Sequence, residues 1–536
     1  MALTETHLSI IHTCANGRDR PILKLNDDLL WEIFRINADM EEEAIGESEQ
    51  NALDTLRYSS QVCSNWRQLI LSSSSLWGQI MNVTSLTHRD WREEVLRRTG
   101  KSLLCILGSN RGGRPPANSR TNNKVALGLI DRYWTRIQSL ELDFTDTDWA
   151  DCGYDVWSIF GRPSPVLERF RVMLLTYEFR EEIHTPLLSD TGFAVFGNAA
   201  PALRVFYAPN IAFSLTAPWL VHLRFLSLNG LLSAYDLLRA IAHMPFLECL
   251  ADENSNAVTR TGGILSETPV PSLNWIAICS FLDIRPYLDL LAHIKPTTTC
   301  SLAFVHSGAI PDAETLDSVN RILKIYSRRC NLVSGEDIYL TLSPILFALE
   351  VHFPSDRTFR FEIDFPTVTQ DGDLPNDGLE NLFNTLPPLF FPDANLLTLE
   401  LSPFAILPSH PKVAEFILAA SSVQFLFTTV ETLAFLLSIP IDILDISFPL
   451  LQKVELSSCP TSLDETTISK FLELRIGMGK QVCNLDIVIA SGDSADLRYL
   501  DAFSGLEVTL RLEEDEVVIH RCGDGCVEDL FIVPRI

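Results

Sequence analysis

The residues best suited to chemistry lie near the carboxyl end, in the segment His520-x-Cys522-Gly-Asp-Gly-Cys526. Imidazole and thiolate groups are ligands that zinc prefers, and three of them fall here within seven residues. A structural zinc site nearly always has four protein ligands, and no fourth is evident in the sequence. The Gly-Asp-Gly run equally suits a turn between strands at 517–520 and 527–533, so we expect a hairpin and no metal.

Motifs that carry catalysis are absent from the sequence. It has no Gly-x-Ser-x-Gly elbow, no His-Glu-x-x-His, no Walker loop and no paired Cys-x-x-Cys. The eleven histidines are dispersed, and the twelve cysteines run from Cys14 to Cys526 without a repeated short spacing. Such cysteines are typical of buried, reduced thiols. We therefore expect a protein that is not an enzyme and binds no cofactor.

One locally basic stretch, 108–123, contains two prolines, three glycines and almost no apolar residue. Its arginines are Arg111, Arg114 and Arg120, with no interleaved aromatic residues to stack on bases. This composition predicts a flexible loop. The formal charge of the chain is −27, which argues against nucleic-acid binding because that binding depends on Lys and Arg against phosphate. Basic or neutral protein partners are favoured.

The length of 536 residues exceeds what one hydrophobic core usually supports, so several domains or an elongated repeat are expected. A hydrophobic content of 46% argues against gross disorder. The first 16 residues lack the pattern of a secretory signal, and the most apolar segment, 423–446, is interrupted by Glu431 and Asp442. We expect no membrane association and a location in the cytoplasm, the nucleus or both.

Hydrophobic periodicity predicts three short helices within residues 23–80. Asn26, Asp27 or Asp28 can cap the first helix. The apolar faces comprise Leu29, Leu30, Ile33 and Phe34 in the first helix, Leu53, Leu56, Ser60 and Cys63 in the second, and Trp66, Leu69 and Ile70 in the third, with Leu76 and Trp77 as a closing anchor. A unit of this size buries too little surface to be stable alone, so it needs a partner.

At these positions the sequence resembles the F-box, the adaptor-binding module of cullin–RING ubiquitin ligases, in the form common among fungal F-box proteins. The resemblance lies in Leu25-x-x-Asp28-Leu29-Leu30-x-x-Ile33-Phe34, then Val62-Cys63-x-x-Trp66-Arg67, then Ser75-Leu76-Trp77. Two features depart from the family: Asn26 replaces the usual proline, and 37–51 is an insert with five glutamates. We expect the insert to be a mobile connection. The alternative is an N-terminal helical cap on a larger domain.

The resemblance implies that this module binds a Skp-type adaptor and, through it, a cullin–RING ligase. It assigns adaptor contacts, or support for them, to Leu25, Asp28, Leu29, Leu30, Ile33, Val62, Trp66, Leu76 and Trp77. A second hypothesis is an interaction scaffold whose F-box-like module acts outside ubiquitination. A third, a hydrolase with an unfamiliar site, would need a deep pocket with convergent titratable groups.

From residue 136 to 536 an apolar-x-x-apolar-x-apolar pattern recurs, often near the 20 to 29 residue period of the leucine-rich repeat. Its clear copies are Ile137-Leu140-Leu142, Leu167-Phe170-Val172, Leu223-Leu226-Leu228, Leu273-Ile276-Ile278, Leu396-Leu399-Leu401, Leu451-Val454-Leu456 and Val482-Leu485-Ile487. Helices are predicted between the strands, at 235–243, 288–294, 316–327, 413–420, 430–437 and 465–472. Prolines such as Pro201, Pro218, Pro245 and Pro271 are expected to end a helix and direct the chain into a strand.

This region resembles the divergent leucine-rich-repeat solenoid that often follows an F-box. The predicted fold class is α/β, with parallel strands on the concave side and helices and loops outside. The predicted division is a tail at 1–20, an F-box-like domain at 21–80, a linker with a helix, a strand and a flexible loop at 81–135, and the solenoid at 136–536. A compact α/β domain is the alternative.

An unknown protein target would bind the strand residues between the apolar positions, which lie side by side on one face of such a sheet. The candidate contacts are Arg169, Arg171, Arg204, Arg224, Asn274, Glu400, Lys453 and Glu455, and Gln138 and Glu141 are expected on the same side. Mixed charges suit protein recognition better than a polyanion. An ordinary solvated face is the alternative.

Overall fold

The computed structural model divides the chain into two compact units, Met1–Leu223 and Arg224–Ile536. The structure describes residues 25–40, 51–108, 119–145, 158–175, 194–208, 211, 213–227, 233–255, 265–281, 283–308, 312–332, 335–355, 357–365, 376–386, 391–457, 464–489, 495–512, 517–525 and 527–532. The tail at 1–20, most of the acidic insert, the arginines Arg111 and Arg114, and Cys526 lie outside these ranges.

The first unit begins with helices. They are α2 (Asp27–Asn37), α4 (Ala52–Val62), α5 (Ser64–Ser72), α6 (Ser74–Gln79), α7 (Arg89–Thr99) and α8 (Ser119–Tyr133), followed by the 3-10 helix η2 (Trp134–Arg136). The Asn26 side chain caps α2 by accepting the Leu29 N–H at 2.9 Å, and Asn51 caps α4 by accepting the Leu53 N–H at 2.9 Å. Asn26 therefore provides a helix start without the proline of the F-box pattern.

Aromatic side chains hold these helices together. Phe34 of α2 meets Trp66 of α5 edge to face, with ring centroids 5.1 Å apart. Trp77 of α6 is fully buried, and its indole N–H donates to the carbonyl of Ile70 at 2.9 Å. The Arg98 guanidinium lies 4.4 Å from the Trp77 ring centroid. The predicted anchor at Trp77 thus joins α5, α6 and α7.

In the described part of the first unit, five parallel strands form a sheet in chain order. They are β1 (Met81–Asn82), β2 (Leu104–Gly108), β3 (Ile137–Thr145), β4 (Arg169–Leu175) and β5 (Val205–Tyr207). The sheet therefore begins before residue 136, where the repeat region was predicted to start. The predicted loop at 108–123 is also too long, because Gly108 ends β2 and residues 119–123 belong to α8.

Short 3-10 helices and aromatic rings fill the space behind β3 to β5. The 3-10 helices are η3 (Ser158–Gly161), η5 (Val195–Asn198) and η6 (Pro218–His222). Phe196 is central, with ring centroids 5.0 Å from Phe170 and 5.7 Å from Trp219. Large rings fill the volume that a helix would otherwise occupy, so this part of the core stays close-packed.

The N-terminal helices are joined to the sheet by close backbone contact. Gly78 of α6 lies so near the segment before β2 that a Cβ there would overlap the carbonyl oxygen of Leu103. Arg136 adds a side-chain bridge, because its Nε and Nη2 donate to the Ser102 carbonyl at 3.0 and 2.6 Å. Helices and strands of the first unit therefore share one packed interface.

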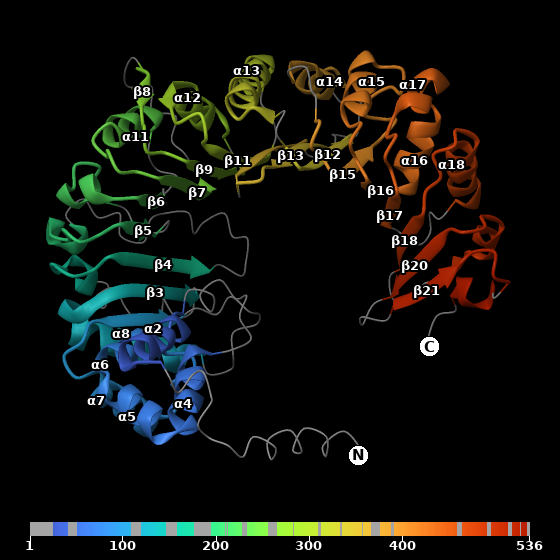
Figure 1. Ribbon diagram of the computed structural model, residues 1–536. Helices are drawn as coiled ribbons and strands as arrows, with labels where there is room; N and C mark the ends of the chain where they lie inside the picture. Colours follow the sequence, from blue (N-terminus) through green and yellow to red (C-terminus); the bar gives the residue numbers. More distant parts are fainter. Residues whose placement is uncertain are drawn as a thin grey trace. The chain divides into compact units, whose positions relative to one another are not determined.

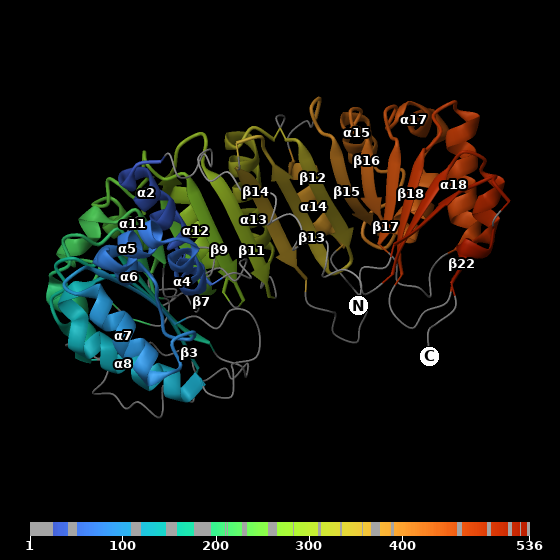
Figure 2. The same ribbon diagram turned by 60° about the horizontal axis from the view of Figure 1, so that its bottom comes forward.

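The described residues of the second unit form a main sheet of thirteen strands. Their succession can be followed in Figures 1 and 2. They are β6 (Phe225–Ser227), β7 (Cys249–Ser255), β9 (Trp275–Ser280), β11 (Ser301–Ser307), β12 (Asp337–Ser343), β13 (Leu346–His352), β14 (Thr358–Asp364), β15 (Leu396–Leu401), β16 (Phe425–Thr428), β17 (Lys453–Ser457), β18 (Asn484–Ile489), β20 (Glu507–Leu512) and β21 (Val517–Arg521). Most neighbours are parallel, which confirms the predicted α/β class with a largely parallel sheet.

Two parts of this sheet differ from the expected parallel succession. The strands β12, β13 and β14 form an antiparallel meander, in which β14 pairs with β11 and β12 pairs with β15. At the carboxyl end β21 is antiparallel to β20. The predicted hairpin of 517–520 with 527–533 is wrong, because β22 (Phe531–Ile532), which follows η11 (Val527–Leu530), pairs instead with β19 (Ala495–Asp496), which precedes η9 (Arg498–Ala502).

Helices of the second unit lie on one face of its sheet (Figure 1). They are α11 (Ala234–Ile241), α12 (Arg285–His293), α13 (Ala313–Arg329), α14 (Asn376–Thr385), α15 (Pro411–Ala419), α16 (Val430–Leu437), α17 (Ile441–Ile446) and α18 (Glu465–Gly477), with the short pair β8 (Thr268–Pro269) and β10 (Ile294–Lys295) beside them. The six predicted helices are present, and α14 and α17 are additional. Among the helices described, none is long and apolar enough to cross a membrane.

The apolar positions of the recurring motif form the core between strands and helices. Leu203, Leu247 and Leu273, each the first apolar residue of a copy, are fully buried. Each donates its N–H to the carbonyl three residues earlier, as Leu247 does to Met244 at 3.2 Å. Proline therefore occupies the second position of a tight turn and fixes its φ there, rather than ending the preceding helix as expected.

We predict that Gly78→Ala lowers the free energy of unfolding of the first unit by about 2 to 3 kcal/mol, because the added methyl group collides with backbone that cannot rotate away. Urea unfolding followed by circular dichroism measures this change. The matched control is Gly128→Ala in α8, where a Cβ meets nothing within 4 Å. It should stabilise the protein by up to about 1 kcal/mol. Equal effects of the two substitutions would show that α6 does not pack tightly on the sheet.

Candidate functional site

The first candidate surface, called here the helical apolar stripe, comprises Leu29 and Ile36 of α2 with Tyr58 and Val62 of α4. Their side chains are 52%, 64%, 60% and 64% exposed. Seven residues separate the α2 pair and four the α4 pair, so each pair lies on one side of its helix. The Asn65 amide of α5 donates to Asp27 at 3.4 Å and holds the start of α5, three residues after Val62, close to the start of α2, which carries Leu29.

The nine predicted adaptor residues divide into exposed and supporting positions. Asp28, Leu29 and Val62 are exposed, while Leu25, Ile33 and Trp66 are half-buried. Leu30, Leu76 and Trp77 are buried in the core, so they support the helices and cannot contact a partner directly. The reason is helix phase: Leu30 and Phe34, four residues apart, share the buried side of α2, where Phe34 meets Trp66 of α5, and this leaves Leu29 outside.

The second candidate surface is the open face of each sheet, defined as the side opposite the buried apolar motif positions. In the first unit it carries Ser139 and Glu141 of β3 beside Arg169 and Arg171 of β4, in matching register. The Arg171 guanidinium lies 4.6 Å from the Tyr207 ring centroid on β5. Three of the predicted surface residues, Glu141, Arg169 and Arg171, are therefore neighbours.

In the second unit Lys453 and Glu455 of β17 share the open face with Asp486 of β18. The Asp486 side chain is only 3% exposed and accepts Lys453 Nζ and an Arg511 guanidinium nitrogen, each at 2.8 Å. Arg511 also lies 3.5 Å from Glu455. This four-residue network, Lys453, Glu455, Asp486 and Arg511, spans β17, β18 and β20, and Glu400 lies on the same face of β15.

A second charged group lies on the open face of the β12–β14 meander. Arg360 contacts Glu362 at 2.5 Å and Glu350 at 3.7 Å, and His352 Nε2 is 2.7 Å from Glu350. Tyr339, in register with Glu350, stacks obliquely on His352, and burial raises the pKa of its phenol. Like the β17–β20 network, this group presents charges of both signs.

Four predicted surface residues lie at the strand entrances instead of the strand centres. Gln138, Arg204, Arg224 and Asn274 each follow the first apolar residue of a motif copy. Arg204 turns back and donates to the carbonyls of its own turn, and Arg224 is 3.4 Å from Glu248 at the next entrance. Arg204 and Arg224 therefore make contacts at the strand entrances, whereas Gln138 lines the same pocket as Glu141 and Arg169.

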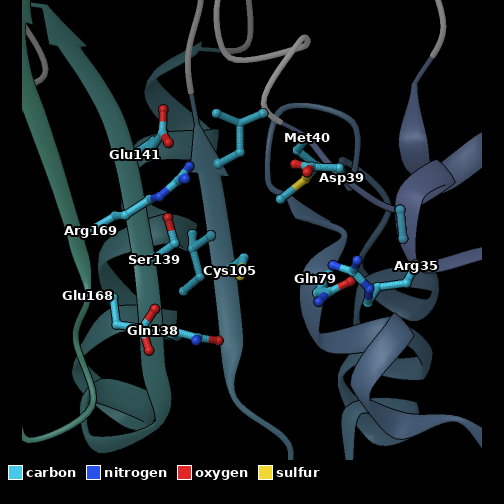
Figure 3. A pocket seen from close by; sticks show the side chains of 13 residues that line it. Arg35, Asp39, Met40, Gln79, Cys105, Gln138, Ser139, Glu141, Glu168 and Arg169 are labelled. Atoms are coloured by element: carbon cyan, nitrogen blue, oxygen red, sulfur yellow. The ribbon is translucent and has the colours of Figure 1, made fainter. Parts of the chain in front are cut away.

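A pocket of about 240 Å³ lies between the carboxyl end of α2 and the open face of the first strands (Figure 3). We call it the helix–sheet pocket. It is lined by Arg35, Ala38, Asp39, Met40, Gln79, Cys105, Ile106, Leu107, Gln138, Ser139, Glu141, Glu168 and Arg169. Burial raises the pKa of the Cys105 thiol to about 11, against the opposing effect of the Arg169 cation, so the thiol is neutral at physiological pH.

The His520 and Cys522 segment forms a structural contact. His520 is buried with Nε2 3.3 Å from Asp501, which also accepts the Gly523 N–H at 2.7 Å. Burial raises the pKa of Cys522 to about 11. Throughout the described ranges no three His, Cys, Asp or Glu side chains cluster so as to hold a metal ion.

Sequence reasoning missed Asp486, Asp39 and Cys105. Asp486 had a usable signal, because Asn484-Leu485-Asp486-Ile487 alternates and places Asp486 beside Glu455 once the strands are aligned. Asp39 and Cys105 had no such signal in the sequence. The pocket forms only where α2 meets β2, and hydrophobic periodicity does not show which elements contact each other.

Comparisons with known proteins leave the family open. No protein-family model matches the chain, and no curated protein matches it either. Among solved structures, the leucine-rich repeat-containing protein LegL7 from Legionella pneumophila is similar at 12% identity and a TM-score of 0.26, over 59% of this chain and 84% of that one. At that score the likeness carries no argument about fold or function.

We predict that Asp486→Asn lowers the free energy of unfolding of the second unit by about 2 kcal/mol, because it leaves the Lys453 and Arg511 cations adjacent without their shared carboxylate. Chemical denaturation measures the loss. The control is Asp496→Asn, which removes an exposed ion pair with Arg498 and should lower the free energy of unfolding much less, because solvent screens that pair. A loss no larger than the control's would mean that the network adds nothing to folding.

Proposed function

We propose that this chain is the substrate-recognition subunit of a Skp–cullin–F-box ubiquitin ligase. Its N-terminal helices act as an F-box that binds a Skp-type adaptor, and its sheet, a divergent leucine-rich-repeat solenoid, binds a protein target. Catalysis belongs to the cullin–RING partners, so the chain itself is not an enzyme. It acts in the cytoplasm, the nucleus or both.

The observation that carries the proposal is the helical apolar stripe. A helix normally buries such residues, yet α2 and α4 bury Leu30, Phe34 and Leu56 inward and expose a second apolar side outward. Exposed Leu, Ile, Tyr and Val side chains on two helices that contact each other mark a candidate protein interface. Its position on α2, which carries the first F-box-like motif, and on α4, whose last residue Val62 begins the second, favours an adaptor as the partner.

The open faces support the second half of the proposal. Their charged groups alternate in sign and are held by neighbours, as Asp486 is between Lys453 and Arg511. Fixed charges of both signs favour a partner with a complementary pattern and give little attraction to a uniform polyanion. A protein target fits this surface better than nucleic acid does.

We predict that Leu29→Asp combined with Val62→Asp abolishes adaptor binding, because each change places a carboxylate in the centre of the apolar contact. Both side chains are more than half exposed, so the fold should persist. Leu30 is unsuitable for this test because it is buried. A carboxylate at that position would unfold the helices, and the loss of binding would then have two causes. The measurement is co-purification of the adaptor and cullin with the tagged chain, identified by mass spectrometry.

The matched control is Leu407→Asp, another exposed leucine in the second unit, which should leave adaptor binding intact. Adaptor binding by the double variant at wild-type strength would refute the assignment of this stripe. Recovery of the adaptor without a cullin from wild-type protein would instead favour a scaffold that acts outside ubiquitination.

A further inference from the structure

We propose that the strand β21 pairs edge to edge with β21 of a second copy of this chain, so that the main sheets of two second units join into one. This pairing goes beyond the proposed function and does not depend on adaptor or target binding. Two features of β21 point to it: main-chain groups that face away from the sheet, and exposed apolar side chains at the same positions.

The strand β21 lies at the carboxyl end of the main sheet (Figure 1). Within the described residues it pairs with β20 on one side and with no strand on the other. Natural edge strands are usually protected by lysine, proline or a bulge. The stretch Val517-Val518-Ile519 contains no lysine or proline, and its register with β20 is unbroken. Such an edge is open to another strand.

The hydrogen bonds at the end of β21 show which of its main-chain groups are in use. The Cys522 N–H donates to the Leu506 carbonyl at 2.8 Å, and the Cys522 carbonyl accepts the Gly505 N–H at 3.0 Å. Bonding alternates along an antiparallel pair, so residues 518 and 520 also direct their main-chain groups to β20. The N–H and C=O groups of residues 517, 519 and 521 therefore face outward.

The residues with outward main-chain groups also carry the exposed side chains. Val517 and Ile519 are 53% and 63% exposed, in register with Arg511 and Thr509 on the open face of β20. A strand added at this edge would place its own side chains beside these two. Apolar side chains are therefore favoured at the facing positions of the partner.

A second copy of β21 supplies such side chains. A two-fold axis perpendicular to the sheet brings two copies of β21 together antiparallel. The residues that bond across the pair must both have outward main-chain groups, and their side chains then lie on one face. The pairing centred on Val518 meets this condition, because Val517 of each copy lies opposite Ile519 of the other.

Charge favours this register over its neighbour. A pairing centred on Ile519 would place the Arg521 cation opposite the apolar Val517. In the pairing centred on Val518, Arg521 comes next to the residues that precede Val517 in the second copy. Their sequence is Glu-Glu-Asp-Glu at 513–516, which lies outside the described residues and is opposite in charge to Arg521. One short segment thus combines an apolar centre with ends of opposite charge, which makes it complementary to itself.

The test is sedimentation velocity of the purified full-length chain over a wide range of protein concentration, where we expect a reversible equilibrium of monomer and dimer. Ile519→Lys should weaken the dimer at least about tenfold, because it places a charge in each apolar pair. The matched control is Ile446→Lys in α17, a position that is 57% exposed, which adds the same charge and should leave the dimer unchanged. A chain that stays monomeric at every concentration would leave the edge to a strand of a different protein and overturn the proposal. Equal weakening by both substitutions would also overturn it.

Cross-linking then tests the register. Val517→Cys chains mixed with Ile519→Cys chains should form a disulfide-linked dimer on oxidation with copper phenanthroline, since facing residues of an antiparallel pair are close enough for a disulfide. The oxidised wild-type chain gives the background from native thiols, of which Cys483 is exposed. A stronger cross-link in Ile519→Cys alone than in the mixture would overturn the register centred on Val518. No cross-link above the background in either sample would overturn the pairing itself.

Discussion

The hydrogen bond at each strand entrance is the constraint on which the rest of the structure depends. The Glu248 N–H donates to the Arg224 carbonyl at 2.7 Å, the Glu248 carbonyl accepts the Asn274 N–H at 2.9 Å, and the Asn274 carbonyl accepts the Ser301 N–H at 2.7 Å. The same bond recurs towards the carboxyl end, from Gln424 to Gln452 and on to Cys483. Because only main-chain atoms take part, the side chain at the entrance can vary. Backbone hydrogen bonds therefore set the spacing of successive strands and of the side chains on the open face. The types of those side chains can change without altering this spacing.

Buried arginines complete the backbone hydrogen bonding where the entrance bonds do not reach. Arg475 of α18 is fully buried and donates to the carbonyls of Lys480 at 3.1 Å, Ser447 at 3.3 Å and Phe448 at 2.9 Å. Phe448 has a φ of +42°, which a side chain other than glycine rarely adopts, so the turn before β17 needs such support. Burial lowers the pKa of Arg475, yet an arginine remains charged at any physiological pH and keeps its five donors. In the first unit the half-buried Arg136 donates to the Thr99 hydroxyl and to the Ser102 carbonyl before β2.

Hydrophobic periodicity could predict those parts of the fold in which residues close together in the sequence determine the secondary structure. Strands were predicted correctly at Leu273-Ile276-Ile278 and Leu451-Val454-Leu456. The three apolar positions of each copy are buried whichever element follows in the chain. The meander was missed because β13 reads as one more alternating strand, and only its pairing with β12 and β14 shows that it runs in reverse. Leu29 and Leu30 illustrate the same limit at a site. Both fit the motif, but only the packing of α2 on α5 decides which one is outside. The pocket was beyond prediction since it joins Asp39 to Cys105, which share no local pattern.

Affinity and specificity are separated in this architecture. The charge of −27 does not make the open face uniformly acidic, because Glu455 and Asp486 are held by Arg511 and Lys453, and Glu350 and Glu362 by Arg360. A partner meeting these groups gains little from bulk attraction and must match their positions, which favours selectivity over strength. The exposed apolar residues of α2 and α4 favour strength over selectivity. Burial of Leu29, Ile36, Tyr58 and Val62 stabilises a complex with any apolar partner of complementary shape. Under the proposed function, we therefore expect strong, general binding at the helices and weaker, selective binding at the sheet, so that one constant partner would stay attached while variable ones exchange.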